Sequence, residues 1–431
     1  MSSSSQESSI TTQSKFKEYA DTTYQKLLPI WQDGLKEAEN KSGWLYQDYW
    51  KAGNSLHAVI NYLVAAGRED SDKLVKNNHD LVYQPRSSYP AGGAWRDDYG
   101  WWGVAFANAY LNHDKLGLDK DLANNCLNAA QNCWNILSKN ADDNESFRHA
   151  FPGNDIRTIG ADYCPWNNEG AKSFVENYRQ INPVPNTVTV CGFWSLTLSL
   201  YKIFYSSPDR TKYEEAIKKI TDWYSFLYTY HSTTQPNILF NSFGLVRETP
   251  NPWPHQIWCF DLDRAWSADQ GVFWYCLIET KKIFGSASET YKQAESMLEY
   301  LVKGFLNDSG NSSNALIRQL YFKEFVTRDV PETKDSNLSN FNDNYCTGPG
   351  VFMRYLGYVG PAEYKLSTMV TYNANQAWSN RVSGDDLIRT WYDKIENTPY
   401  KQYFVESSQL WKFAFQVAGL DLFTTAMKVD S

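Results

Sequence analysis

The sequence from residue 94 to residue 106 reads Ala94-Trp95-Arg96-Asp97-Asp98-Tyr99-Gly100-Trp101-Trp102-Gly103-Val104-Ala105-Phe106. Two adjacent carboxylates are followed closely by two adjacent indoles. The spacing of the apolar residues predicts a helix from Asp97 to about Leu111, with the carboxylates in its first turn. Aromatic faces stack on the C–H faces of sugars, and glycosidic bonds break between two carboxyl groups. The stretch therefore indicates a helical protein that acts on carbohydrate.

Helical periodicity continues on both sides of this stretch. The other predicted helices cover Phe16–Leu28, Tyr46–Leu63, Lys120–Leu137, Thr187–Tyr205, Lys212–Tyr230, Arg264–Phe284, Glu289–Phe305, Tyr345–Gly357, Ala362–Val382, Asp386–Ile395 and Ser407–Met427. Strand candidates are short and few, namely Ile238–Phe240 and Leu245–Arg247. Because no repeat of fixed period accompanies the paired helices, we expect an all-α fold closed into an (α/α) barrel of about six hairpins rather than an open solenoid.

The chain is expected to form one large domain over residues 13–431, preceded by a disordered tail over residues 1–12. A long Pro- and Gly-containing connection runs from Asn140 to Pro185. Loops of this length inside a domain usually carry function, so we expect the long loops to gather at one end of the barrel. That arrangement would place Trp166 and the Asp97–Asp98 pair around one cleft.

Composition limits the partners of this protein. The 431 residues carry a net charge of -8, and no run of Lys and Arg is interleaved with aromatic residues, which disfavours nucleic acid and anionic membranes. No apolar stretch predicts membrane insertion. The 17 Trp and 29 Tyr residues either pack in the core or line a groove for a polyhydroxylated ligand. We expect a monomer, which is cytoplasmic if the chain is complete and secreted or periplasmic if a leader was removed.

The cysteines and histidines predict neither a metal site nor a cofactor. The seven Cys residues form an odd set without CxxC spacing, which favours buried free thiols. The six His residues show no HExxH motif, so no catalytic zinc is expected.

The acid pair has a structural alternative, because an Asp at a helix start often serves as an N-cap. One cap, however, needs only one Asp, and the pair precedes Trp101 and Trp102. A retaining glycosidase needs carboxyl groups about 5 to 5.5 Å apart, and an inverting one about 6.5 to 9.5 Å. Adjacent residues fit the shorter distance better, which favours retention. Arg96 could keep the nucleophile ionised, but the sequence pattern leaves open which Asp is the nucleophile.

Two further clusters contain polar residues beside apolar helices. Asp269 and Gln270 could cap the helix that follows them or hydrogen-bond sugar hydroxyls, and both alternatives stay open. Arg354 lies in an otherwise apolar helix, where a structural ion pair is the favoured interpretation.

Together these motifs resemble glycoside hydrolase family 76 (GH76), the endo-α-1,6-mannanases and their fungal cell-wall relatives. The resemblance covers most of the chain and is carried by Tyr49-Trp50-Lys51-Ala52-Gly53, Asp97-Asp98-Tyr99-Gly100-Trp101-Trp102, Asp269-Gln270-Gly271, and Gly350 with Arg354-Tyr355-Leu356. The chain departs from the family pattern at Ala268-Asp269, where the family has Tyr-Asn, and at Pro349, where it has Lys.

The resemblance implies an (α/α)6 barrel and a retaining mechanism with Asp97 as nucleophile and Asp98 as acid/base. The leading hypothesis is a retaining endo-glycoside hydrolase for α-1,6-mannan or a related α-linked glycan. The residues expected to bind substrate are Trp101, Trp102, Asp269, Gln270, Trp166 and Arg96. The alternatives are a transglycosylase or a non-catalytic glycan-binding protein on the same barrel, or a sugar epimerase, which would need two converging histidines.

Overall fold

The computed structural model describes residues 15–31, 49–68, 75–76, 96–138, 187–229, 239–241, 244–248, 265–308, 337–361, 363, 366–381, 384, 388 and 409–429. The predicted tail at residues 1–12, the connection that holds Trp166, and most of the predicted helix Asp386–Ile395 lie outside these residues. The side chains of Arg96, Asp97 and Asp98 also lie outside the description, although their backbone is helical.

The described part of the chain is almost entirely helical, which confirms the predicted fold class. Residues 15–31 form a helix, and the remaining helices are α2 (Tyr49–Ala66), α4 (Arg96–Leu111), α5 (His113–Leu116), α6 (Lys120–Ser138), α8 (Thr187–Ile203), α9 (Arg210–Thr229), α10 (Ser267–Ile283), α11 (Glu289–Asp308), α13 (Asn337–Val359), α14 (Ser367–Ser379) and α16 (Gln409–Val429). Among the described residues, one antiparallel bridge, Phe240 with Val246, lies where the two strand candidates were predicted.

Most predicted helices begin and end within a few residues of the observed ones. The end of α2 has a clear cause: Gly67 has φ +66°, and the Arg68 N–H donates to the Leu63 carbonyl at 2.9 Å, which closes the last turn. The prediction for α13 was wrong at its start, because the helix begins at Asn337 rather than Tyr345 and includes Pro349. The polar residues before Tyr345 lack the apolar spacing on which the prediction relied.

The helices fall into two compact units, which we describe separately. Unit 1 comprises Met1–Ser88, Asn112–Lys120 and Asp308–Ser431, and unit 2 comprises Tyr89–Leu111 and Asp121–Asn307. Unit 1 contains helix 15–31, α2, α5, α13, α14 and α16. Unit 2 contains α4, α8, α9 and α10, with α6 and α11 apart from one terminal residue each. The single domain predicted over residues 13–431 stays a prediction.

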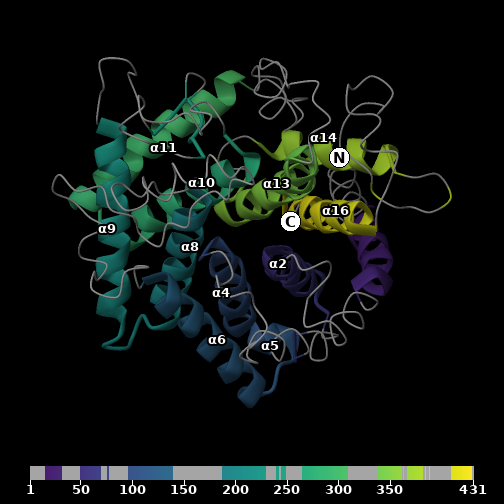
Figure 1. The fold of residues 1–431 in the computed structure, drawn as a ribbon, viewed down its shortest axis with the longest axis horizontal. Helices are drawn as coiled ribbons and strands as arrows, with labels where there is room; N and C mark the ends of the chain where they lie inside the picture. Colours follow the sequence, from purple (N-terminus) through teal and green to yellow (C-terminus); the bar gives the residue numbers. More distant parts are fainter. Residues whose placement is uncertain are drawn as a thin grey trace, which may run out of the picture. The chain divides into compact units, whose positions relative to one another are not determined.

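Burial separates two kinds of helix in unit 2. In α8 and α10 nearly every side chain is buried, so these helices are enclosed on all sides. In α6 and α9 the buried residues recur three and four positions apart along one face, which is typical of helices that cover a core from outside. Helix α8 packs against α4, α9 and α10, as can be followed in Figure 1. Stacked helical hairpins produce this combination of enclosed inner helices and partly exposed outer helices.

The inner helices of unit 1 run parallel. Arg354 of α13 bonds the Asn54 carbonyl of α2, and Tyr358 bonds Asn61 one to two turns further along both helices. Similarly, Gly350 faces Ala418 of α16, and one turn later Arg354 pairs with Asp421. The residue numbers rise together in each pair, so α2, α13 and α16 start at the same end of the unit.

The close contact between α13 and α16 yields a stability prediction. A Cβ atom added at Gly350 would lie 2.5 Å from the Ala418 Cα, which is backbone and cannot rotate away. We expect Gly350→Ala to lower the free energy of unfolding by about 1 to 3 kcal/mol in urea titrations. Gly285→Ala is the control, because nothing lies within 4 Å of its added Cβ. Equal unfolding free energies for the two variants would contradict the close packing.

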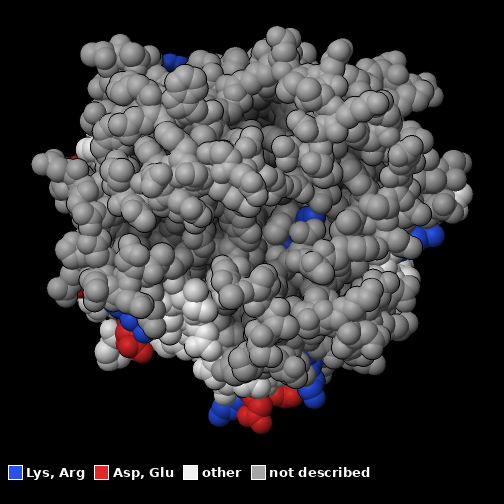
Figure 2. Space-filling model, viewed as in Figure 1, with Lys and Arg blue, Asp and Glu red and all other residues white. Residues whose placement is uncertain are grey.

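The described charged side chains are mixed in sign. On the face shown in Figure 2, Lys and Arg lie beside Asp and Glu along the lower edge rather than in one basic patch. Ion pairs such as Lys218 with Glu214 contribute to this mixing. Among the described helices, none has the length and apolar character needed to cross a membrane.

Candidate active site

The acid pair lies in the first turn of α4, as the sequence predicts. Two glycines fix this helix against α8. A Cβ at Gly100 would lie 3.1 Å from the Gly192 Cα, and a Cβ at Gly103 would lie 2.5 Å from Leu196 Cδ2. Since Gly100 faces Gly192 and Gly103 faces Leu196, the helices α4 and α8 run parallel. Counting back along both helices places Asp97 and Asp98 level with the first turns of α8.

Helix α10 starts at the same end of unit 2. The Val246 N–H donates to Gln270 Oε1 at 2.8 Å, and Gln270 Nε2 donates to the Val246 carbonyl at 2.9 Å. Two residues after Val246, the Glu248 carbonyl accepts the first N–H of α8, that of Thr187, at 2.7 Å. Residues 244–248 therefore connect the starts of α8 and α10. The first turns of α4, α8 and α10 thus gather on one side of unit 2, and Asp97, Asp98 and Asp269 lie in or next to them.

Gln270 has a structural role in this arrangement. Its amide nitrogen also donates to the Trp266 carbonyl at 3.1 Å, and the side chain is buried. The amide therefore bonds the backbone of Val246 and Trp266, and a contact of Gln270 with sugar hydroxyls stays a prediction. The N-cap position of α10 is Trp266, which makes no side-chain cap. A sugar contact by Asp269 stays a prediction.

Asp269 lies beside a buried cluster of neutral groups. The Cys191 thiol is 3.4 Å from the Tyr224 hydroxyl, and the Cys276 thiol points at the Cys191 carbonyl at 3.8 Å. Burial raises the pKa of both thiols and of the Tyr224 phenol, and the nearby Asp269 charge raises the pKa of Cys191 and Tyr224 further. The two thiols and the phenol therefore stay protonated.

The four described cysteine side chains fit the predicted buried free thiols. Cys126, Cys133, Cys191 and Cys276 are free and buried, and burial raises the pKa of Cys126 and Cys133 to about 12. Thiols of this kind are unreactive, which separates them from the candidate chemistry.

The two indoles after the acid pair are buried. Trp102 is 1% exposed and stacks on Phe106 with ring centroids 5.6 Å apart, so its ring belongs to the core of unit 2. Trp101 is also buried, and sugar stacking by either indole stays a prediction. Trp166 and the side chain of Arg96 lie outside the described residues.

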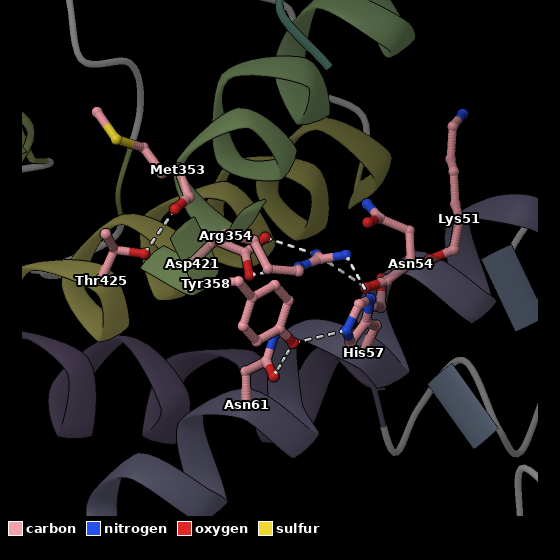
Figure 3. Close-up of polar contacts among 10 residues, drawn as sticks. Lys51, Asn54, His57, Asn61, Met353, Arg354, Tyr358, Asp421 and Thr425 are labelled. Atoms are coloured by element: carbon pink, nitrogen blue, oxygen red, sulfur yellow. Dashed lines mark hydrogen bonds and ion pairs between the residues drawn. The ribbon is translucent and has the colours of Figure 1, made fainter. Parts of the chain in front are cut away.

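Arg354 forms the structural ion pair that the sequence predicts, within unit 1. Its guanidinium binds Asp421 through Nε to Oδ1 at 2.8 Å and Nη2 to Oδ2 at 2.6 Å, and both side chains are 1% exposed. Figure 3 shows the network continuing from Arg354 to His57, Tyr358 and Asn61. Arg354 Nη1 lies 3.2 Å from His57 Nδ1, and His57 Nε2 lies 2.9 Å from the Tyr358 hydroxyl.

The direction of each hydrogen bond in this network follows from chemistry. Arginine can only donate, so His57 Nδ1 accepts and the ring proton sits on Nε2. Nε2–H then donates to Tyr358, whose hydroxyl donates to the Asn61 side-chain oxygen. Burial lowers the pKa of His57 well below 6.5, and the positive charges of Arg354 and Lys428 lower it further. His57 is therefore neutral in the folded protein.

This network predicts a loss of stability in acid. The unfolded chain binds a proton on His57 as the pH falls through about 6.5, whereas the folded chain does not. From about pH 7.5 to about pH 5.5 this linkage should remove about 1.4 kcal/mol of unfolding free energy. Burial also raises the pKa of Asp421 to about 6, which acts in the opposite direction.

A His57→Gln variant isolates the histidine contribution, because Asp421 and Lys428 are present in both proteins. Urea unfolding at the two pH values should show that the wild type loses about 1.4 kcal/mol more than the variant. Equal losses would mean that His57 titrates alike in the folded and unfolded chain.

No three potential ligands among the described His, Cys, Asp and Glu side chains gather around a metal position. Of the two histidines described, His57 is engaged in the ion-pair network and His113 lies beside Asp114 at 3.3 Å.

Comparison with known proteins rests on structure alone. No protein-family model and no curated protein matches the sequence. The α-1,6-mannanase GH76A of Salegentibacter sp. HEL1_6 is similar at 12% identity and a TM-score of 0.53, over 95% of this chain and 98% of that one. An inactive variant of that enzyme, with two consecutive aspartates changed to alanine and in complex with α-1,6-mannotetraose, aligns with a TM-score of 0.55 at 12% identity, over 96% of this chain and 98% of that one.

The chain has the fold of the GH76 α-1,6-mannanases. A third structure, the Lin0763 protein from Listeria innocua, shares this fold at 16% identity and a TM-score of 0.56, over 95% of this chain and 96% of that one. The GH76 fold confirms the helical barrel that the sequence predicts. Sequence identities this low show the fold alone.

Proposed function

We propose that the protein is a retaining endo-glycoside hydrolase that cleaves α-1,6-mannan or a related α-linked glycan. The observation that carries this proposal is the Asp97–Asp98 pair in the first turn of α4, within a chain that has the GH76 fold. In the similar mannanase, the variant with two consecutive aspartates replaced is inactive. The consecutive acids Asp97 and Asp98 support the same chemistry here.

In the proposed mechanism, Asp97 attacks the anomeric carbon while Asp98 protonates the leaving oxygen. The resulting glycosyl-enzyme ester is then hydrolysed by a water that Asp98 deprotonates, which restores both carboxyl groups. The partial positive charge of a helix N-terminus favours an ionised carboxylate in the first turn. Asp269, at the same end of unit 2, is proposed to bind a sugar hydroxyl.

Incubation with α-1,6-mannooligosaccharides tests the proposal. The wild type should release shorter oligosaccharides whose first-formed reducing ends have the α configuration in NMR spectra, and Asp98→Asn should release none at the same enzyme concentration. Asp114→Asn is a matched control, because Asp114 is 92% exposed in α5. Equal product formation by wild type and Asp98→Asn, or none by either, would refute the proposal, and β products would refute retention.

A further inference from the structure

A second polar site lies on α2, in unit 1, outside the acid pair. Lys51, Asn54, His57 and Asn61 occupy successive turns of one side of this helix, and all four side chains are buried. His57 and Asn61 are engaged in the Arg354 network. Lys51 and Asn54 lie nearer the start of the helix, and Figure 3 shows both side chains extending away from His57.

The Asn54 side chain is the unexplained group. It is 1% exposed, and neither its amide oxygen nor its amide nitrogen has a hydrogen-bond partner in the structure. Its backbone carbonyl is engaged by Arg354 Nη2 at 3.0 Å, which fixes the turn that carries it. Buried polar atoms in folded proteins are nearly always bonded, and an amide left unbonded on both atoms destabilises the fold. A group outside the chain is therefore expected to complete these bonds.

The chemistry of the amide restricts that group. Oδ1 only accepts and Nδ2 only donates, so an anion would leave the oxygen unbonded and a cation would leave the nitrogen unbonded. Two neighbouring hydroxyls, each able to donate and accept, satisfy both atoms at once. One turn earlier, the Lys51 ammonium lies 5.6 Å from the centroid of the partly exposed Trp50 ring. An indole next to hydrogen-bonding groups suits a sugar ring.

We propose that Asn54, with Lys51 and Trp50, forms a subsite that binds neighbouring hydroxyl groups of a neutral glycan. The proposal rests on the proposed function for the identity of that glycan. Because the amide is buried, its bonds to the sugar form away from bulk water, and a glycan unit that lacks either hydroxyl is discriminated against. Asn54 is thus assigned a role in glycan binding within unit 1.

The test compares Asn54→Leu with Thr424→Val. Thr424 of α16 is a matched control in the same unit, because its buried hydroxyl also has no partner in the structure and no role is proposed for it. Both substitutions remove an unbonded polar group, so both should raise Tm or leave it unchanged. Binding of α-1,6-mannotetraose is then measured by calorimetry in an Asp98→Asn background, which prevents turnover.

We expect Asn54→Leu to bind the tetrasaccharide at least about tenfold more weakly than its parent, and Thr424→Val to bind like its parent. Asn54→Ala should show the same loss, which keeps the test valid if leucine does not fit. Unchanged affinity in the Asn54 variants, with hydrolysis by the wild type, would overturn this subsite alone and would mean that water satisfies the amide. Absence of both binding and hydrolysis by the wild type would overturn the proposed function together with the subsite.

Discussion

Replacing Asp98 by alanine is expected to lower kcat for α-1,6-mannooligosaccharides by about 10² to 10⁴-fold, while Tm changes little. The loss corresponds to removal of the general acid that protonates the leaving oxygen. A substrate with an activated nitrophenyl leaving group needs less protonation, so the loss on that substrate should be smaller. Asp97→Ala should be inactive on both substrates, because the nucleophile is required whatever the leaving group. The measurement is steady-state kinetics on the two substrates.

Added azide separates the two roles by stereochemistry. In Asp98→Ala, azide attacks the glycosyl-enzyme intermediate and should give the α-glycosyl azide, since two inversions restore the starting configuration. In Asp97→Ala, azide can occupy the vacated nucleophile position and should give the β-glycosyl azide by one inversion. The opposite pair of products would exchange the roles of the two residues. Identical products from both variants would contradict the double-displacement mechanism.

Removal of Arg354 is expected to destabilise the protein by about 3 to 5 kcal/mol in urea unfolding, because the Asp421 carboxylate is left buried without its counter-ion. Two further acceptors, His57 Nδ1 and the Asn54 carbonyl, lose their donor in the same variant. Arg354→Lys should recover only part of the loss, since one ammonium cannot reproduce the planar set of donors. The double variant Arg354→Met with Asp421→Leu should be more stable than either single variant.

The exposed pair Lys218 with Glu214 provides the comparison. Its nitrogen–oxygen distance is 2.7 Å, similar to that of the buried pair, but its side chains are accessible to water. Lys218→Ala should therefore cost less than about 1 kcal/mol. If Arg354→Ala cost no more than Lys218→Ala, the buried network would not stabilise unit 1 as described.

Local patterns predicted the helices well. The acid pair in the first turn of α4 and the end of α2 at Gly67 were both predicted, because each depends on residues within one or two turns. The ion pair of Arg354 was also predicted as a type of interaction, since a buried Arg in an apolar helix needs a counter-charge. Its partner Asp421 could not be named, because the two residues meet only through the packing of α13 on α16.

Other features depend on contacts that the local pattern does not contain. Gln270 bonds Val246, which lies 24 residues earlier. The only sequence signal for it was the pair of short strand candidates that includes Val246. Trp102 shows a second limit of prediction from sequence. Helical spacing indicates that this indole faces inward, but it does not identify Phe106 as the ring on which it stacks. No sequence pattern singled out Asn54, because its buried amide is recognised only by the missing hydrogen bonds in the folded structure.

Identification of the residue that becomes covalently attached to the glycan tests the central claim most directly. The protein would be incubated with an α-manno-configured cyclitol epoxide, which traps the nucleophile of a retaining enzyme, and then digested for peptide mass spectrometry. One adduct on Asp97, blocked by prior addition of α-1,6-mannotetraose, is the predicted result. An adduct on any other residue, or full hydrolytic activity without an adduct, would contradict the assignment of the neighbouring acids at the start of α4 as the catalytic pair.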